Sequence, residues 1–211
     1  MKNIHEFNEK ALNYLRKIEC NEDLSNPLLI SPKCSGKIMY VGQETNCWQG
    51  GLRDNEYKVI ELEELYYEKF FNSNFKNTLF WKFVREIYEK YNVSDDIIWT
   101  NVLLVGKKDS IGKPLNSDRI RDISIENLIS IYENFNIEKI ICVAGPNNPY
   151  YDVFTSFLDE IGKTISGYPC KEQTVVYSDD KKAAYLYHPQ YLWRNDIYDD
   201  VVDEMKLFIK K

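Results

Sequence analysis

The stretch KIMYVG at residues 37–42 is a short apolar run that ends at a glycine. Apolar residues at successive positions, without alternation, are typical of a strand that is covered on both faces of a parallel sheet. The runs DIIWTNVLLV at 96–105 and KIICVAG at 139–145 have the same character, and 174–178 and 183–188 are further strand candidates. The sequence therefore predicts a sheet built from short, buried strands.

Helical patterns separate these runs. Apolar residues recur at helical spacing in the segments 4–19, 57–72, 77–91, 123–135, 151–161 and 196–210. Strands that alternate with helices predict an α/β fold, here a three-layer α/β/α sandwich with a central, mainly parallel four-stranded sheet. We expect the 211 residues to form one domain, with its core at roughly 36–205, because no repeat or linker divides the chain.

The charge balance bears on the class of partner. Lys and Arg number 27 and Asp and Glu number 33, which gives 27 − 33 = −6. An acidic total argues against a protein that coats nucleic acid without specificity, because phosphate binding favours net positive charge. A local basic face remains compatible with this total.

The cysteines indicate a reducing compartment. The chain has five, Cys20, Cys34, Cys47, Cys142 and Cys170, and none lie in a CxxC pair. Scattered thiols of this kind predict a cytoplasmic protein without disulfides, metal or other cofactor. The polar N-terminus does not resemble a signal peptide, and no apolar run approaches the roughly 20 residues of a membrane helix. We expect a monomer.

Each predicted strand is followed by an unusual loop. GQE follows the first strand, Asn101 lies late in the second, AGPNN at 144–148 follows the third, and HPQ at 188–190 follows the last. Ligands of open α/β sheets bind beyond the carboxyl ends of the strands. These loops are therefore expected to form one pocket.

The same motifs, in this order, resemble those of the uracil-DNA glycosylase superfamily. GQETNC at 42–47 is similar to GQDPYH of its best-known branch, and WTN at 99–101 is similar to the Thr-Asn motif of another branch. HPQYLWRN at 188–195 resembles the last motif, HPS or HPA continued as YLLRN in the iron–sulfur branch. The resemblance implies a DNA glycosylase that hydrolyses the N-glycosidic bond of uracil or a related modified pyrimidine.

The chain also departs from these patterns. The cluster cysteines of the iron–sulfur branch are not recognisable, so no cluster is expected. Glu44 stands where GQDPYH has aspartate, and Asn46 stands where its tyrosine excludes the methyl group of thymine. A pocket without that tyrosine is expected to accept a base larger than uracil.

Two residues are assigned to the chemistry. Glu44 is expected to orient or deprotonate the attacking water and to stabilise the cationic sugar. His188 is expected to donate a hydrogen bond to the base oxygen on which negative charge grows. The alternatives are a Glu44 that caps backbone or pairs with Arg53, and a His188 that is satisfied by backbone at the end of a strand.

Base recognition is assigned to Asn101, Gln43 and Trp48. The amide of Asn101 offers an acceptor for the N3 hydrogen and a donor to O4, which matches uracil. Gln43 is expected to contact the base or the water, and Trp48 or Tyr57 to stack on the base. The alternatives are an Asn101 bonded to a neighbouring loop and two aromatic rings that belong to the core.

The DNA contact is assigned to Leu192, Arg194 and the polar loop after the second strand. Leu192 has the offset from His188 at which the superfamily wedges a side chain into the duplex, and Tyr191 and Trp193 flank it. Arg194, Lys107, Lys108 and Lys113 are the candidate phosphate contacts, together with Arg119 and Arg121. The alternatives are aromatic and aliphatic side chains that pack inward and a loop whose charges are merely solvated.

Two other functions remain open from the sequence. The first is a member of the same fold that binds nucleic acid or protein without cleaving a glycosidic bond, as the altered first motif and the acidic total allow. The second is an enzyme that acts on free nucleosides or nucleotides.

Overall fold

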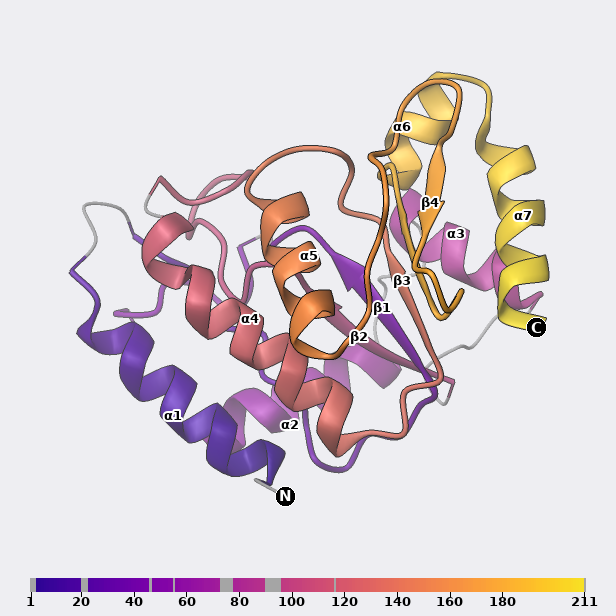
Figure 1. The fold of residues 1–211 in the computed structure, drawn as a ribbon. Helices are drawn as coiled ribbons and strands as arrows, with labels where there is room; N and C mark the ends of the chain where they lie inside the picture. The colour runs from indigo at the N-terminus through magenta and orange to yellow at the C-terminus, as the bar shows by residue number, and fades with distance from the viewer. Residues whose placement is uncertain are drawn as a thin grey trace.

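The centre of the computed structural model, which describes residues 3–19, 23–45, 47–54, 56–72, 78–89, 96–115 and 117–210, is an open sheet. Its strands are β1 (Ile38–Gly42), β2 (Ile97–Asn101), β3 (Lys139–Cys142), β4 (Val175–Tyr177) and β5 (Ala183–Leu186). They lie in the order β2-β1-β3-β5-β4, and only β4 runs antiparallel to its neighbour (Figure 1). This order places β3 at the centre of the sheet, with β1 and β5 on either side.

The absence of alternation in the strand sequences has a direct structural cause. All residues of β1 and β2 are buried, because helices cover both faces of the sheet. The two strands pair in parallel with Ile38 opposite Ile97 and Gly42 opposite Asn101. Both therefore end at the same level of the sheet, and this register positions the loops that follow.

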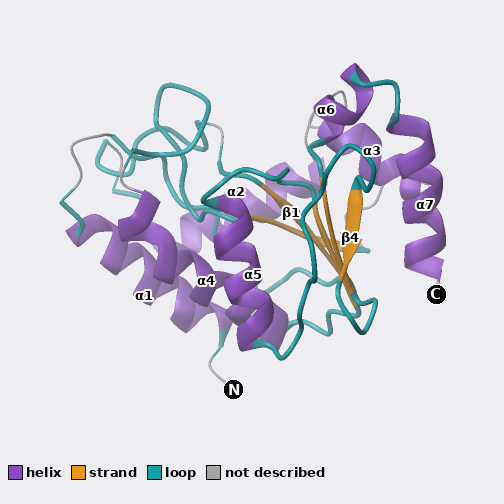
Figure 2. Ribbon diagram, turned by 45° about the horizontal axis from the view of Figure 1, so that its top comes forward, coloured by secondary structure: helices purple, strands orange, loops and turns teal. Residues whose placement is uncertain are grey.

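Seven helices of the described chain form the outer layers. They are α1 (Ile4–Lys17), α2 (Val59–Asn72), α3 (Leu79–Tyr88), α4 (Ser117–Asn134), α5 (Tyr150–Glu160), α6 (Pro189–Arg194) and α7 (Tyr198–Lys210). Figure 2 shows α1, α4 and α5 on one side of the strands and α3, α6 and α7 on the other. Neighbouring helices in each group pack directly against one another. The three-layer α/β/α arrangement is thus confirmed.

The sequence-based description needs four corrections. Helix α4 begins at Ser117 rather than at 123, so Arg119 and Arg121 belong to this helix and not to the loop after the second strand. The sheet has five strands rather than four, since β4 adds to the edge of β5. The second strand ends at Asn101 instead of continuing to 105. Residues 189–194 are a short helix rather than a loop, because the His188 side chain caps its first turn and Pro189 occupies its first position.

The helix lengths also bear on membranes. None of the helices in the described part of the chain is long and apolar enough to cross a bilayer.

Helix α1 is amphipathic. It begins where Asn3 accepts a hydrogen bond from the His5 amide, and it buries Phe7, Leu12 and Leu15 against the domain.

Candidate active site

The carboxyl ends of four parallel strands meet at one edge, as the loop sequences predict. The Val143 amide donates to the Val41 carbonyl at 2.9 Å, and the Gly145 amide donates to the Leu186 carbonyl at 3.0 Å. The Gln43 side chain crosses this edge, and its Nε2 donates to the Ala144 carbonyl at 2.7 Å. The loops after β1, β3 and β5 are therefore joined into one structural unit.

Asn101 ends β2 at this edge and is almost completely buried, with 3% of its surface exposed. Its Nδ2 is buried and has no hydrogen-bond partner among the residues that the structure describes. A buried donor without a partner costs about 1–3 kcal/mol, so native structures keep such groups mainly where they serve a function. The amide of Asn101 is therefore a buried, unsatisfied donor at the carboxyl end of β2.

Gly42 makes room for this amide. A Cβ atom at Gly42 would lie 2.5 Å from Oδ1 of Asn101 and 3.2 Å from Cε2 of Phe80. Both approaches are closer than ordinary van der Waals contact, so no larger residue fits without displacing one of these side chains. The glycine of the first motif is therefore a packing requirement of the site.

His188 follows β5 and caps helix α6. Its Nδ1 accepts a hydrogen bond from the Gln190 amide at 3.2 Å, so that nitrogen carries no proton. Burial lowers the pKa of His188 below its usual value of 6.5. At neutral pH the ring is therefore uncharged with its proton on Nε2, which is the tautomer that donates a hydrogen bond.

Phe80 is a member of the site that the sequence did not reveal. Its ring lies 6.2 Å from the His188 ring, centroid to centroid, with 21° between the planes, and it also packs on Tyr40 at 4.6 Å. Phe80 thus stands beside Gly42, Asn101 and His188. An aromatic residue at the start of a helical pattern is predicted to belong to the hydrophobic core. Only the tertiary structure shows that Phe80 lies next to His188.

Glu44 is held by two donors. The Gly112 amide donates to its Oε1 at 3.2 Å, and the Tyr150 hydroxyl donates to its Oε2. Burial raises the pKa of Glu44, and the bonds from Tyr150 and Gly112, together with the charge of Lys107, oppose that rise. Arg53, the alternative partner, instead donates to the Ile18 carbonyl at 2.7 Å. Tyr150 is the second residue of the site that the sequence did not reveal.

Two of the base-recognition assignments change. Trp48 is buried, and its ring meets the Trp99 ring edge-on at 5.9 Å, so it is packed in the core and does not offer a face for stacking. One N–H of Gln43 Nε2 donates to the Ala144 carbonyl, which leaves its second N–H and its Oε1 for other contacts. Tyr57 also packs against the core. Asn101 is the member of this set that lies at the end of a strand, beside Gly42 and Phe80, with a buried, unpartnered Nδ2.

The expectation of an exposed Leu192 wedge is wrong for this conformation. Leu192 is 0% exposed, whereas Tyr191 and Trp193 on either side of it are 39% and 51% exposed. The reason is the helical turn of α6, which packs on α3 and α7 and directs its middle residue inward. The aromatic neighbours, and not the leucine, face the outside.

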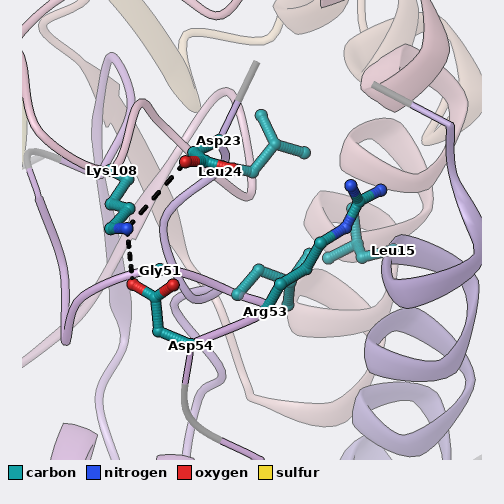
Figure 3. Close-up of a pocket in the computed structure, with 8 residues that line it drawn as sticks. Leu15, Asp23, Leu24, Gly51, Arg53, Asp54 and Lys108 are labelled. Atoms are coloured by element: carbon teal, nitrogen blue, oxygen red, sulfur yellow. Dashed lines mark ion pairs between the residues drawn. The ribbon is translucent and has the colours of Figure 1, made fainter. Parts of the chain in front are cut away.

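The basic loop also differs from the expectation. Lys108 pairs with Asp54 at 2.7 Å and with Asp23 at 3.9 Å, beside a cavity of about 10 Å³ that is roughly the size of one water (Figure 3). Its charge is therefore neutralised locally. Lys113 reaches the Asn148 carbonyl at 3.2 Å, near the Tyr150 end of α5. Arg194 is exposed on α6, and Lys107 is half-buried near Glu44.

Some of the predictions concern residues that the structure does not describe. Asn46, the residue at the place of the missing tyrosine, and Cys20 lie outside the described residues. Of the cysteines that the structure does describe, Cys34 and Cys142 are buried thiols and Cys47 and Cys170 are exposed thiols. Within the same residues, no group of three or more His, Cys, Asp and Glu side chains is arranged to hold a metal ion.

Comparison with known proteins adds no family. No protein-family model matches the chain, and no curated protein matches it significantly. The functional argument therefore rests on the geometry of Asn101, Phe80, His188 and Glu44.

Proposed function

We propose that the chain is a DNA glycosylase that hydrolyses the N-glycosidic bond of uracil or a related modified pyrimidine, as its motifs resemble the uracil-DNA glycosylase superfamily. The observation that carries this proposal is the buried, unpartnered Nδ2 of Asn101, whose side chain and Phe80 both lie over Gly42. The Phe80 ring in turn stacks on the His188 ring. An amide, an aromatic face and a neutral imidazole are the groups that a flipped pyrimidine requires.

The recognition step uses Phe80 and Asn101. The Phe80 ring offers an aromatic surface on which a base can stack, a contact worth about 1–3 kcal/mol per base. Asn101 Nδ2 then donates to a carbonyl oxygen of the pyrimidine, and its Oδ1 accepts from the N3 hydrogen. Cytosine presents the reverse order of donor and acceptor, so an amide that keeps this orientation discriminates against it.

The bond-breaking step uses His188. As the bond between C1′ of the sugar and the base nitrogen breaks, both electrons leave with the base and negative charge grows on its carbonyl oxygen. The Nε2–H of a neutral His188 donates to that oxygen, a stabilisation that is strongest where water is excluded. The sugar is left with oxocarbenium character.

The hydrolytic step uses Glu44. Its ionised carboxylate stabilises the cationic sugar and accepts one proton from a water, whose oxygen forms the new bond to C1′. That proton then passes to the departed base, so the products are an abasic site and a neutral base. A carboxylate has about four lone-pair directions and two donors bind here, which leaves capacity for the water.

The partner in this proposal is DNA with an extruded base, bound by a monomer in the cytoplasm. The exposed groups beside the site are Lys113, Arg194 and the aromatic residues of α6. A cytoplasmic location fits the free thiols of the described cysteines. The acidic total of −6 implies that contacts to phosphate are few and local.

The test is direct. Purified protein is incubated with single-stranded and duplex oligonucleotides that hold one uracil, one thymine or one modified cytosine, and abasic sites are then cleaved with alkali. We expect scission at uracil or at one of the larger pyrimidines, and its loss in Glu44→Gln, Asn101→Ala and His188→Ala. Intact strands with every substrate would overturn the proposal.

A second candidate is a protein of the same fold that binds nucleic acid without cleaving it. The altered first motif favours it, since Glu44 stands where the motif of the superfamily has the aspartate that handles the water. Tight binding of an oligonucleotide with no base release, unaffected by His188→Ala, would select this function. Base release from a free nucleotide but not from DNA would select an enzyme of nucleotides instead.

A further inference from the structure

The contact between Glu44 and Tyr150 joins two parts of the chain that no sequence motif connects. Tyr150 opens helix α5 just after the loop that follows β3, and only 5% of its surface is exposed. Its hydroxyl donates to Oε2 of Glu44, while the Gly112 amide holds Oε1. Each oxygen of the carboxylate is therefore fixed by a donor from a different loop or helix.

The direction of this hydrogen bond is settled by the tyrosine. Burial, and then the charge of Glu44, raise the pKa of the Tyr150 hydroxyl far above its usual value. The hydroxyl thus keeps its proton throughout the pH range of any assay and is always the donor. A permanent donor favours the ionised form of its carboxylate partner.

Glu44 needs such a donor more than a shorter residue would. Glutamate has one more rotatable bond than aspartate, and its carboxylate is buried here, which by itself favours the protonated form. The charged and polar groups that face this carboxylate are Tyr150 on α5, the Gly112 amide and Lys107 of the loop after β2. Tyr150 provides a side-chain hydrogen bond to Oε2 of this carboxylate.

We propose that Tyr150 is a positioning residue, which holds the Glu44 carboxylate in one rotamer and in its ionised form so that it can act on water. The catalytic consequence of this inference rests on the proposed function. The effect of Tyr150 on the ionisation of Glu44 is independent of that function, because it can be measured without any substrate.

The experiment compares Tyr150→Phe with Tyr151→Phe. Tyr151 is the next residue of α5, and its hydroxyl donates to the Gly167 carbonyl at 2.5 Å, away from Glu44. Titration of the Glu44 carboxyl carbon by NMR, assigned with Glu44→Gln, should show protonation at higher pH in Tyr150→Phe than in the wild type and in Tyr151→Phe. In the glycosylase assay, Tyr150→Phe should lose about tenfold at the acidic end and little at the alkaline end.

The outcomes separate the two claims. Superimposable titrations of Glu44 in the wild type and in Tyr150→Phe overturn the role of Tyr150, whether or not any base is released. A loss of activity that is equal at every pH overturns the claim that Tyr150 keeps Glu44 ionised, because that claim predicts a larger loss on the acidic side. A wild type without base release, but with a shifted Glu44 titration in Tyr150→Phe, overturns the glycosylase and retains the contact.

A second variant covers a Tyr150→Phe that does not fold. A fluorinated tyrosine placed at position 150 keeps the ring and its packing, and its more acidic hydroxyl is a stronger donor. Glu44 should then titrate at lower pH than in the wild type. An unchanged or upward displacement contradicts the inference.

Discussion

Gly42 and Asn101 lie opposite each other at the ends of two parallel strands, so close that a Cβ atom on the glycine would be 2.5 Å from the asparagine Oδ1. The asparagine side chain is the movable partner, because the strand backbone is buried on all sides. Any side chain at position 42 therefore changes the place of the amide that is expected to read the base.

Gly42→Ala tests this relationship. We expect the variant to fold with a loss of about 1 kcal/mol, and to lose about 100-fold in kcat/KM, since small misplacements at an active site cost that much. The measurements are thermal unfolding and base release from the preferred substrate. Gly162→Ala is the control: it strains a backbone with φ of 69° but faces open space, so it should lower stability and leave activity intact.

Phe80→Leu tests the stacking surface. Leucine retains much of the apolar volume but has no ring, so substrate binding should weaken about 5-fold to 150-fold, the equivalent of about 1–3 kcal/mol of stacking. Phe83→Leu is the matched control on the same helix. Phe83 is buried against Tyr198 and should affect stability alone. Equal kinetics for Phe80→Leu and the wild type would contradict a stacking role.

The pH dependence follows from Glu44 and His188 together. Burial raises the pKa of Glu44 and lowers that of His188, and the mechanism needs the first ionised and the second neutral. Both conditions are met above the two pKa values, and both fail as pH falls through them. We therefore expect kcat/KM to decline as pH falls through these two pKa values and to stay level above them. A decline on the alkaline side that His188→Gln removes would contradict this assignment.

Residues 192 and 193 should separate stability from DNA contact. Leu192→Ala removes a buried side chain and should cost about 2–5 kcal/mol of unfolding free energy. Trp193→Ala removes an exposed ring that lies under the Lys82 ammonium at 4.7 Å, and should weaken oligonucleotide binding by about 5-fold to 10-fold with little loss of stability. Tyr14→Ala, an exposed aromatic change on α1, is the binding control. Binding that depends on Leu192 in a fully folded variant would restore the leucine wedge.

The lysines of the loop after β2 should not be equivalent. Lys108 is already paired with Asp54 and Asp23, so Lys108→Ala should leave DNA affinity and its salt dependence nearly unchanged. Lys113→Ala should lower affinity and reduce the slope of log K against log salt by about 0.7–0.9 if one phosphate contact is lost. Fluorescence anisotropy with a labelled oligonucleotide at several salt concentrations measures both. A larger effect of Lys108 than of Lys113 would refute this ranking.

The sequence was sufficient where structure follows from local pattern. The runs at 37–42 and 139–145 are strands because continuous apolar character is needed at the centre of a covered sheet. The gathering of Asn101 and His188 at one edge follows from the common direction of parallel strands. Their chemical roles as catalytic and reading groups remain predictions.

The sequence was insufficient where contacts are distant or depend on side-chain direction. Phe80 meets His188 and Tyr150 meets Glu44 across more than 100 residues, and no spacing rule encodes such pairs. The Leu192 side chain points inward because residues 189–194 form a short helix, whereas the sequence motif predicts a loop there. The sequence could not show that Lys108 pairs with Asp23 and Asp54, because these two residues come from other loops.

The bond from Gln43 to the Ala144 carbonyl has a consequence for protein engineering. This hydrogen bond links two loops that are far apart in the chain, so the conformation of each loop depends on the other. A graft that exchanges residues 42–47 alone would bring a new recognition loop without its support. Successful transfer of base preference into or out of this scaffold therefore requires that both loops be moved as a pair.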